Sequence, residues 1–173
     1  MPVSELIRKN AIIREGSFRK KAYDRAVLEF CSLLGINMAY MQVQGGGSFL
    51  GNGWESCNLF GLALQDVTVE MDRFRLCSMG STDFRGVRLE DVRFCGCSFA
   101  GSVWTGTVVE GGVFQDCSFR GMRLQKVRFR KTVFQKCVLD DCCLEAVTME
   151  MVRFQGCTIR DVKGMPEQGV RFL

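Results

Sequence analysis

The chain has 173 residues, of which 47% are hydrophobic, and a net charge of +4, values that predict one globular domain with a sizeable core. No apolar run approaches the roughly 18 residues of a membrane span and the start lacks a secretory signal, so we expect a soluble protein in the reducing cytoplasm, unless a specialised secretion system exports it. Because the sequence has no histidine, it lacks the commonest general base and metal ligand.

Residues 1–46 are expected to form an N-terminal helical cap and a lead-in strand. Within residues 17–35, apolar side chains recur at the spacing of one helical face: Tyr23, Val27, Phe30 and Leu34. Residues 37–44 then lead into the next region as a strand, with the glycines at 45–47 as a hinge. A cap of this kind would cover the open end of a stacked ribbon.

Residues 47–164 carry a period of five. Every fifth residue from Phe49 to Ile159 is apolar, without a break over twenty-three positions, and a mostly small residue stands two places before each. A small, a polar and a large residue in succession have the alternation of a strand, and the two polar positions that follow predict a corner. We therefore expect three-residue strands that turn every five residues, with their large side chains facing one axis.

A longer period of twenty residues sets the size of one coil. Cysteine and phenylalanine both recur at this spacing: Cys57, Cys77, Cys97, Cys117, Cys137 and Cys157, and Phe74, Phe94, Phe114, Phe134 and Phe154. Four corners therefore close one coil, and like residues lie above each other in successive coils. About six coils at the roughly 4.8 Å spacing of paired strands predict a rod roughly 28 Å long.

Several of these five-residue units resemble the pentapeptide-repeat family: CSFRG, VRFRK, TDFRG, CNLFG and VRLED. The resemblance covers residues 47–164 in one register and implies a mainly β fold, a right-handed quadrilateral parallel β-helix. The second place of the unit, often Asn or Asp in the family, is here commonly Arg, Ser or Val.

The cysteine column is expected to pack the core. Stacked thiols lie in a line, whereas zinc needs four converging donors, and their parallel direction keeps the Cβ atoms farther apart than a disulfide prefers. Only Cys95 and Cys143 fall at outward positions, while Cys31 lies on the expected helix. We therefore predict reduced thiols, no metal and no cofactor.

Asp72 falls at an inward, small-residue position, one coil after Asn52 and near the expected end of the rod. A buried carboxylate there is either a functional acid, or it accepts backbone N–H bonds or reaches water.

Outward arginines and valines form the candidate partner surface: Arg73, Arg93, Arg153, Arg88, Arg128, Arg120, Arg123, Val113 and Val133. The first three share one outward row, the next two share another, and the two valines are vertically adjacent. Basic residues also gather along the sequence between 120 and 136. Such a surface either docks an acidic partner or is a solvated face that prevents sideways association.

The sequence predicts a non-catalytic protein-binding scaffold. It offers no nucleophile with an oriented base and no phosphate-binding loop, and a filled rod has no cleft for a substrate. The family resemblance implies roles such as bacterial effectors, secretion-linked adaptors and immunity proteins. The resemblance also implies an alternative to these roles, which is DNA-mimic-like protection of DNA gyrase or topoisomerase against quinolones or toxins.

The charge balance argues against that alternative. Residues 47–164 hold fifteen Lys/Arg against fourteen Asp/Glu, so this region is neither an acidic mimic nor a dedicated nucleic-acid binder.

The tail, residues 165–173, either folds over the last coil or pairs with another chain, which would give a homodimer through the C-terminal end.

Overall fold

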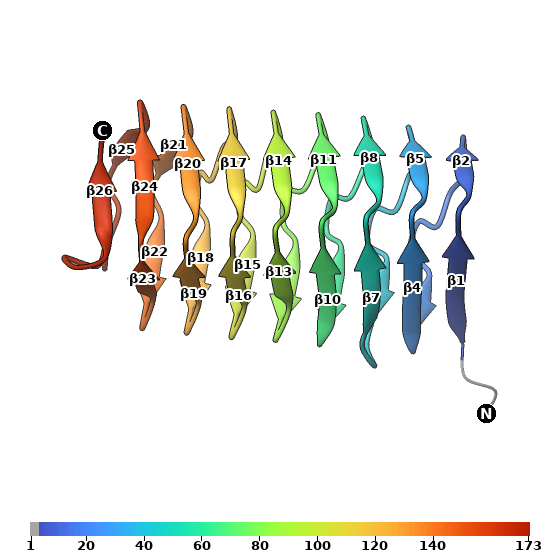
Figure 1. The fold of residues 1–173 in the computed structure, drawn as a ribbon. Helices are drawn as coiled ribbons and strands as arrows, with labels where there is room; N and C mark the ends of the chain where they lie inside the picture. The colour runs from blue at the N-terminus through green and yellow to red at the C-terminus, as the bar shows by residue number, and fades with distance from the viewer. Residues whose placement is uncertain (1–3) are drawn as a thin grey trace.

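The computed structural model describes residues 4–173, which form a four-sided parallel β-solenoid of about eight turns (Figure 1). Within this range the chain forms twenty-six short strands and no helix. Equivalent strands of successive coils pair in parallel, so each side of the coil becomes a sheet that runs along the rod. We number these sides faces 1 to 4, in the order in which the chain visits them in every coil.

Faces 1 and 2 are continuous sheets. Face 1 consists of eight strands: β1 (Glu5–Lys9), β4 (Arg25–Glu29), β7 (Gly47–Leu50), β10 (Val67–Glu70), β13 (Arg88–Glu90), β16 (Val108–Glu110), β19 (Arg128–Arg130) and β23 (Thr148–Glu150). Face 2 consists of nine: β2 (Ile12–Arg14), β5 (Ser32–Leu34), β8 (Gly53–Glu55), β11 (Arg73–Arg75), β14 (Arg93–Cys95), β17 (Val113–Gln115), β20 (Val133–Gln135), β24 (Val152–Gln155) and β26 (Val170–Phe172).

Face 3 is held mainly by single bridges and face 4 by a sheet. The bridges of face 3 connect residues one coil apart from Ser17 to Val138, and β21 (Val138–Asp140) then pairs with β25 (Thr158–Arg160). Face 4 consists of seven strands: β3 (Ala22–Tyr23), β6 (Gln42–Val43), β9 (Ala63–Gln65), β12 (Asp83–Arg85), β15 (Val103–Thr105), β18 (Arg123–Gln125) and β22 (Cys143–Glu145).

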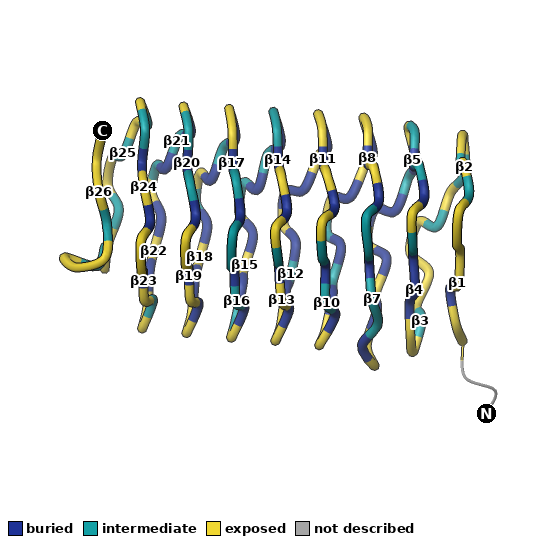
Figure 2. Tube along the Cα trace, viewed as in Figure 1, coloured by how far each residue is buried: buried dark blue, intermediate teal, exposed yellow. Residues whose placement is uncertain are grey.

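The core confirms the period of five. From Phe49 to Phe154 every fifth side chain is buried, and Ile159 is partly buried. Figure 2 shows buried and exposed residues alternating along the strands. On face 2 the aromatic rings stack from Trp54 to Phe172, with centroids 4.7–5.3 Å apart. Each large buried side chain contributes roughly 1.5–3 kcal/mol, so the column holds the coils together.

The predicted N-terminal helical cap is wrong. Strands β1 to β6 form two further coils, so the solenoid extends through residues 5–43, and the six expected coils become about eight. The residues expected on one helical face go to different sides of the rod: Val27 is buried, whereas Phe30 is 56% exposed at a corner. Cys31 is not on a helix but is buried at an inward position beside β5.

One extra residue hides these two coils from the period. Leu28 pairs with Phe49 and Leu33 with Trp54, a separation of 21 residues where later coils have 20. The extra residue lies at the glycines 45–47. Gly47 has φ +147°, and a Cβ there would lie 1.9 Å from the carbonyl oxygen of Ala26, so only glycine fits.

The C-terminal tail folds over the last coil. β26 pairs with β24, and the ring of Phe172 stacks on Phe154 with centroids 5.3 Å apart. This is the first of the two alternatives for residues 165–173, and a homodimer through this end stays a prediction. None of residues 4–173 forms a helix that is long and apolar enough to cross a membrane.

Candidate functional site

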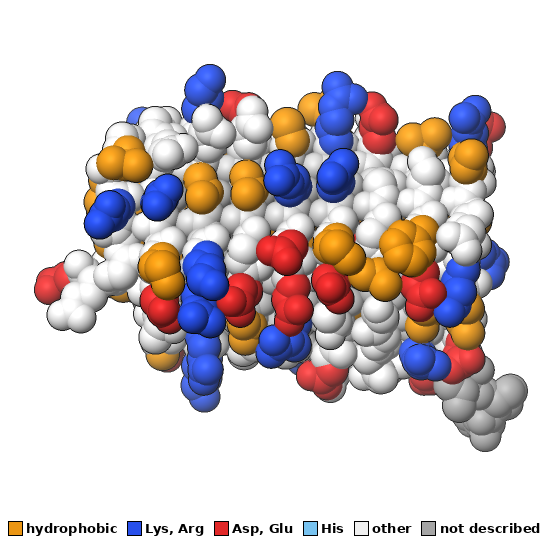
Figure 3. Space-filling view, in the orientation of Figure 1, with side chains coloured by type: hydrophobic (Ala, Val, Ile, Leu, Met, Phe, Trp, Pro, Cys, Tyr) orange, Lys and Arg blue, Asp and Glu red, His pale blue; other side chains and the backbone are white. Residues whose placement is uncertain are grey.

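Face 2 brings five of the predicted partner-surface residues into one row. The parallel register of β11, β14, β17, β20, β24 and β26 stacks one outward residue from each strand directly beside the next. We call these six residues the arginine row: Arg73, Arg93, Val113, Val133, Arg153 and Arg171. In Figure 3 the row crosses the upper part of the visible surface, with blue spheres at both ends and orange spheres between them.

The arginines of this row lack an anionic partner. Among residues 4–173, Arg73, Arg93 and Arg153 form no ion pair and no side-chain hydrogen bond. The strands β11, β14, β17, β20 and β24 contain no carboxylate. Like charges on directly opposite residues repel. Arg73, Arg93 and Arg153 are therefore not neutralised by an ion pair within residues 4–173, whereas Arg75 on the same face pairs with Glu55.

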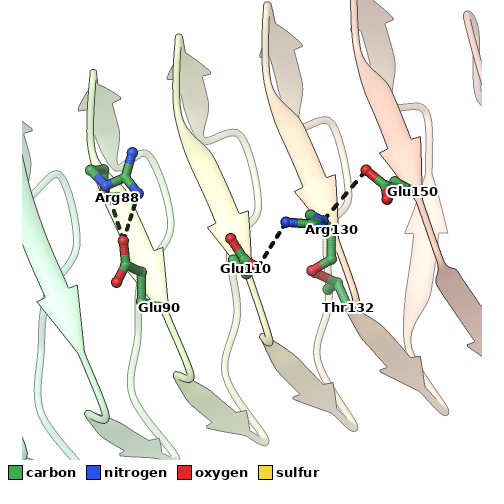
Figure 4. A network of polar contacts seen from close by, with 6 residues as sticks. All are labelled: Arg88, Glu90, Glu110, Arg130, Thr132 and Glu150. Atoms are coloured by element: carbon green, nitrogen blue, oxygen red, sulfur yellow. Dashed lines mark hydrogen bonds and ion pairs between the residues drawn. The ribbon is translucent and has the colours of Figure 1, made fainter.

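Face 1 differs because several of its charges are paired locally. Figure 4 shows Arg88 bound to Glu90 at 2.7 Å, and Arg130 placed between Glu110 at 3.3 Å and Glu150 at 3.4 Å. Exposed pairs of this kind contribute little stability, about 0–1 kcal/mol each. They do neutralise Arg88 and Arg130, whereas Arg128 of this face forms no ion pair among residues 4–173. Face 2 is distinctive because its unpaired arginines share one row with two valines.

A row of amides runs beside the arginine row. Gln115, Gln135 and Gln155 lie one coil apart, two residues after the arginine row on the same strands, and Cys95 has the equivalent position in the preceding coil. Their side-chain amides make no hydrogen bond to other residues within 4–173. Sequence reasoning missed this row and Arg171, although the recurrence of glutamine every twenty residues is visible in the sequence.

Residues 113–150 match the protein-family model described as "Pentapeptide repeats", in eight copies. This segment spans β17 to β23, where the strands and corners follow the five-residue period without interruption. Residues 113–150 carry the pentapeptide repeat.

Solved structures with a similar fold include pentapeptide-repeat proteins. A trypsin-treated form of QnrB1, a plasmid-mediated fluoroquinolone resistance protein, is 14% identical over 86% of this chain and 79% of its own, with a TM-score of 0.45. HetL, from the cyanobacterium Nostoc sp. strain PCC 7120, is 13% identical over 91% and 84%, with a TM-score of 0.39. Rfr23, from the cyanobacterium Cyanothece 51142, is 13% identical over 78% and 90%, with a TM-score of 0.33. No curated protein matches the sequence. Similarities this low do not indicate a binding partner for this chain.

The other predicted surface residues of this solenoid do not join the row. Arg88 and Arg128 lie on face 1 with Val108 between them. Arg123 lies on face 4 in β18, and Arg120 pairs with Asp140 at 3.5 Å. The basic residues between 120 and 136 are thus distributed around the rod, because twenty consecutive residues make one full turn.

Asp72 lies at the centre of a buried polar network. Its carboxylate accepts hydrogen bonds from the backbone N–H of Asn52 at 2.7 Å, from the Asn52 amide at 3.1 Å and from the Trp54 indole at 2.8 Å. The Asn52 side chain in turn accepts from the Cys31 N–H and donates to the Leu28 carbonyl, both at 2.8 Å.

Asp72 is not near an end of the rod, because two coils precede the expected start. It accepts backbone and side-chain N–H bonds and is 0% exposed, so it does not reach water. Burial raises the pKa of Asp72 to about 7, and the hydrogen bonds from Asn52 and Trp54 oppose this rise. The carboxylate therefore belongs to the core and faces no ligand site.

The cysteine column also belongs to the core. All ten cysteines are free thiols. The thiol of Cys57 donates to the carbonyl of Leu33 at 3.3 Å, and the thiol of Cys157 to that of Phe134 at 3.2 Å, in each case one coil earlier. Burial raises the pKa of Cys142 and of Cys157, which keeps both thiols neutral.

The interior leaves no room for a ligand. Two internal voids, one around Phe119 and Phe129 and one around Leu59 and Met79, have volumes of about 20 and 10 Å³. Both voids are lined by apolar side chains and are far smaller than ligand pockets, which have volumes of about 300–1,000 Å³. Residues 4–173 also contain no group of three or more side chains suited to holding a metal ion. Any binding by the described part of the chain therefore takes place on its outer faces.

Proposed function

We propose that this pentapeptide-repeat protein is a non-catalytic scaffold that binds a protein partner through the arginine row of face 2. One observation supports this most directly: unpaired arginines flank two half-buried valines, Val113 and Val133, along one face. An apolar centre with a polar rim, and an enrichment in arginine, are typical of protein interfaces.

The rigidity of the face suits it to docking. Its nine strands are hydrogen-bonded into one sheet, and the stacked rings behind them are fully packed. A preorganised surface loses little conformational entropy on binding. The outward side chains of this face are mainly arginine, valine and glutamine, which supply contacts and charge but no oriented general base.

A capture experiment with matched charge reversals tests the proposal. The full chain is used to capture proteins from the native host cell, beside the variants Arg93→Glu/Arg153→Glu and Arg123→Glu/Arg128→Glu. Both pairs change the net charge equally and alter exposed arginines without an ion pair among residues 4–173, but only the first lies on face 2. We expect a defined partner to be lost from the first variant and retained by the second. A partner retained by both would contradict the choice of face.

The alternative, protection of gyrase by DNA mimicry, finds less support on the surface. The longest outward carboxylate row of face 1 is Glu70, Glu90 and Glu110, and two of these three bind arginine. A mimic of a nucleic-acid backbone needs a longer continuous negative surface. A supercoiling assay with a gyrase poison decides between the two, because protection at near-stoichiometric protein would favour the alternative.

A further inference from the structure

We infer that the arginine row binds an extended acidic segment in which two acidic residues, four positions apart, flank one apolar residue. This inference rests on the proposed function, since it names the partner chemistry of the same face. The segment would lie along the rod axis, across the strands of face 2. Its pattern is acid–x–apolar–x–acid, where x is any residue.

The spacing of the row selects this pattern. Coils are stacked at about 4.8 Å, so Arg93 and Arg153, three coils apart, are separated by about 14 Å along the rod. Side chains on one side of an extended segment recur every two residues, or about 6.7 Å, which puts two acids four residues apart at about 13 Å. The two arginines can then bind both carboxylates in one register.

The valines fit the residue midway between the acids. That residue would lie about 7 Å from Arg93 along the axis, whereas Val113 lies at about 5 Å and Val133 at about 10 Å. An apolar side chain would therefore contact both valines at the seam between their coils. At the two ends, Arg73 and Arg171 each extend the row by one coil and suit a further acid on either side.

The glutamine row favours an extended segment over a helix. A helix satisfies its own backbone N–H and C=O groups, but an extended segment leaves them free. Gln115, Gln135 and Gln155 offer donors and acceptors alongside the arginine row, and no residue of the described chain uses their amides. They are placed to hydrogen-bond the backbone of a segment whose side chains face the arginines and valines.

Charge complementarity favours a carboxylate-bearing polypeptide over a nucleic acid. Arginine binds carboxylates through paired N–H···O bonds, and no acid on β11 to β24 of face 2 competes for it. A nucleic-acid backbone presents a charge at every nucleotide, whereas two coils of this row carry valine instead.

A labelled peptide tests the inference on the full chain. The probe is Glu-Ser-Glu-Ser-Val-Ser-Glu-Ser-Glu, which repeats the pattern, and its control is Val-Ser-Ser-Ser-Ser-Glu-Glu-Glu-Glu, which has the same composition without the spacing. Binding is followed by fluorescence anisotropy at two salt concentrations. We expect the probe to bind at least about tenfold more tightly than the control, and Arg93→Glu/Arg153→Glu to remove this binding.

Further variants separate the contributions of charge and apolar contact. Val113→Ser/Val133→Ser should weaken binding of the probe and leave binding of the control peptide unchanged. Arg123→Glu/Arg128→Glu should change the binding of neither peptide. Each variant is checked for an unchanged melting temperature, so that loss of binding is not loss of fold. Equal binding of probe and control, or equal losses in the face 2 and control variants, would overturn the inference.

The outcomes also separate this inference from the proposed function. If the probe does not bind, or if a duplex DNA oligonucleotide binds more tightly, the extended acidic segment is wrong. In that case a cellular partner that still depends on Arg93 and Arg153 leaves the scaffold proposal intact. If neither peptide binding nor cellular capture depends on these two arginines, both proposals fail.

Discussion

The indole N–H of Trp54 donates to the carboxylate of Asp72 across 2.8 Å inside the solenoid, from the preceding coil. No basic side chain takes part in this network, so the carboxylate is held by neutral donors alone. Desolvation of the charge raises the pKa of Asp72 to about 7, above its ordinary value of 3.8. The folded protein therefore binds a proton at Asp72 that the unfolded chain releases at lower pH.

The first prediction is that stability falls as the pH rises from about 4 to about 7. Over this interval the folded state holds the proton of Asp72 and the unfolded state does not, so the free energy of unfolding decreases with pH. Three pKa units correspond to about 4 kcal/mol at most. Below pH 4 and above pH 7 this contribution is constant.

Urea unfolding at a series of pH values measures the effect, with Asp72→Asn as the control. Asparagine does not titrate, so the difference between the two proteins isolates this one carboxyl from all other groups. Parallel pH profiles for the two proteins would contradict the assignment.

The second prediction concerns the inserted residue between the second and third coils. Gly47→Ala should lower the free energy of unfolding by about 3 kcal/mol or more, because the new Cβ would meet the Ala26 carbonyl oxygen and the backbone would be held at φ +147°. Gly53→Ala is the matched control, since a Cβ there meets nothing within 4 Å. We expect it to change stability by less than about 1 kcal/mol. Similar losses in both variants, measured by thermal and urea unfolding, would rule out this explanation of the insertion.

The third prediction concerns the aromatic column. Phe114 is 0% exposed and stacks between Phe94 at 5.0 Å and Phe134 at 4.9 Å. Phe114→Ala should cost about 3–5 kcal/mol, because it leaves a cavity in the middle of the rod. Phe172→Ala, at the 57% exposed end of the same column, should cost less than about 1 kcal/mol. Equal costs in urea unfolding would show that the column is not the main source of cohesion.

The fourth prediction concerns thiol reactivity. Cys143 is exposed and Cys95 and Cys157 are half-buried, while the other seven of the ten thiols are buried. In a native thiol titration Cys143 should react first, Cys95 and Cys157 more slowly, and the rest only in denaturant, since buried neutral thiols are poor nucleophiles. Cys143→Ser should remove the fast phase. Fewer than ten reactive thiols in denaturant, without reductant, would reveal a disulfide that the structure lacks.

The sequence by itself determined which residues face inward from Phe49 to Ile159. The reason is local: a three-residue strand and a two-residue corner repeat without a change of register, so every fifth side chain must point to the same axis. The family resemblance and the stacked cysteine and phenylalanine columns follow from the same period.

Only the tertiary structure decided the first two coils and which arginines lack an ion-pair partner. The single extra residue before Phe49 puts the earlier coils out of phase with the later ones. The spacing of Tyr23, Val27, Phe30 and Leu34 also matches one face of a helix, so the sequence predicted a helix there. The basic residues between 120 and 136 are close in sequence but spread around the rod. The period of twenty had already predicted one outward row for Arg73, Arg93 and Arg153, because coils stack in register. Only the structure shows that Arg171 extends this row and that its neighbours supply no ion pair within residues 4–173.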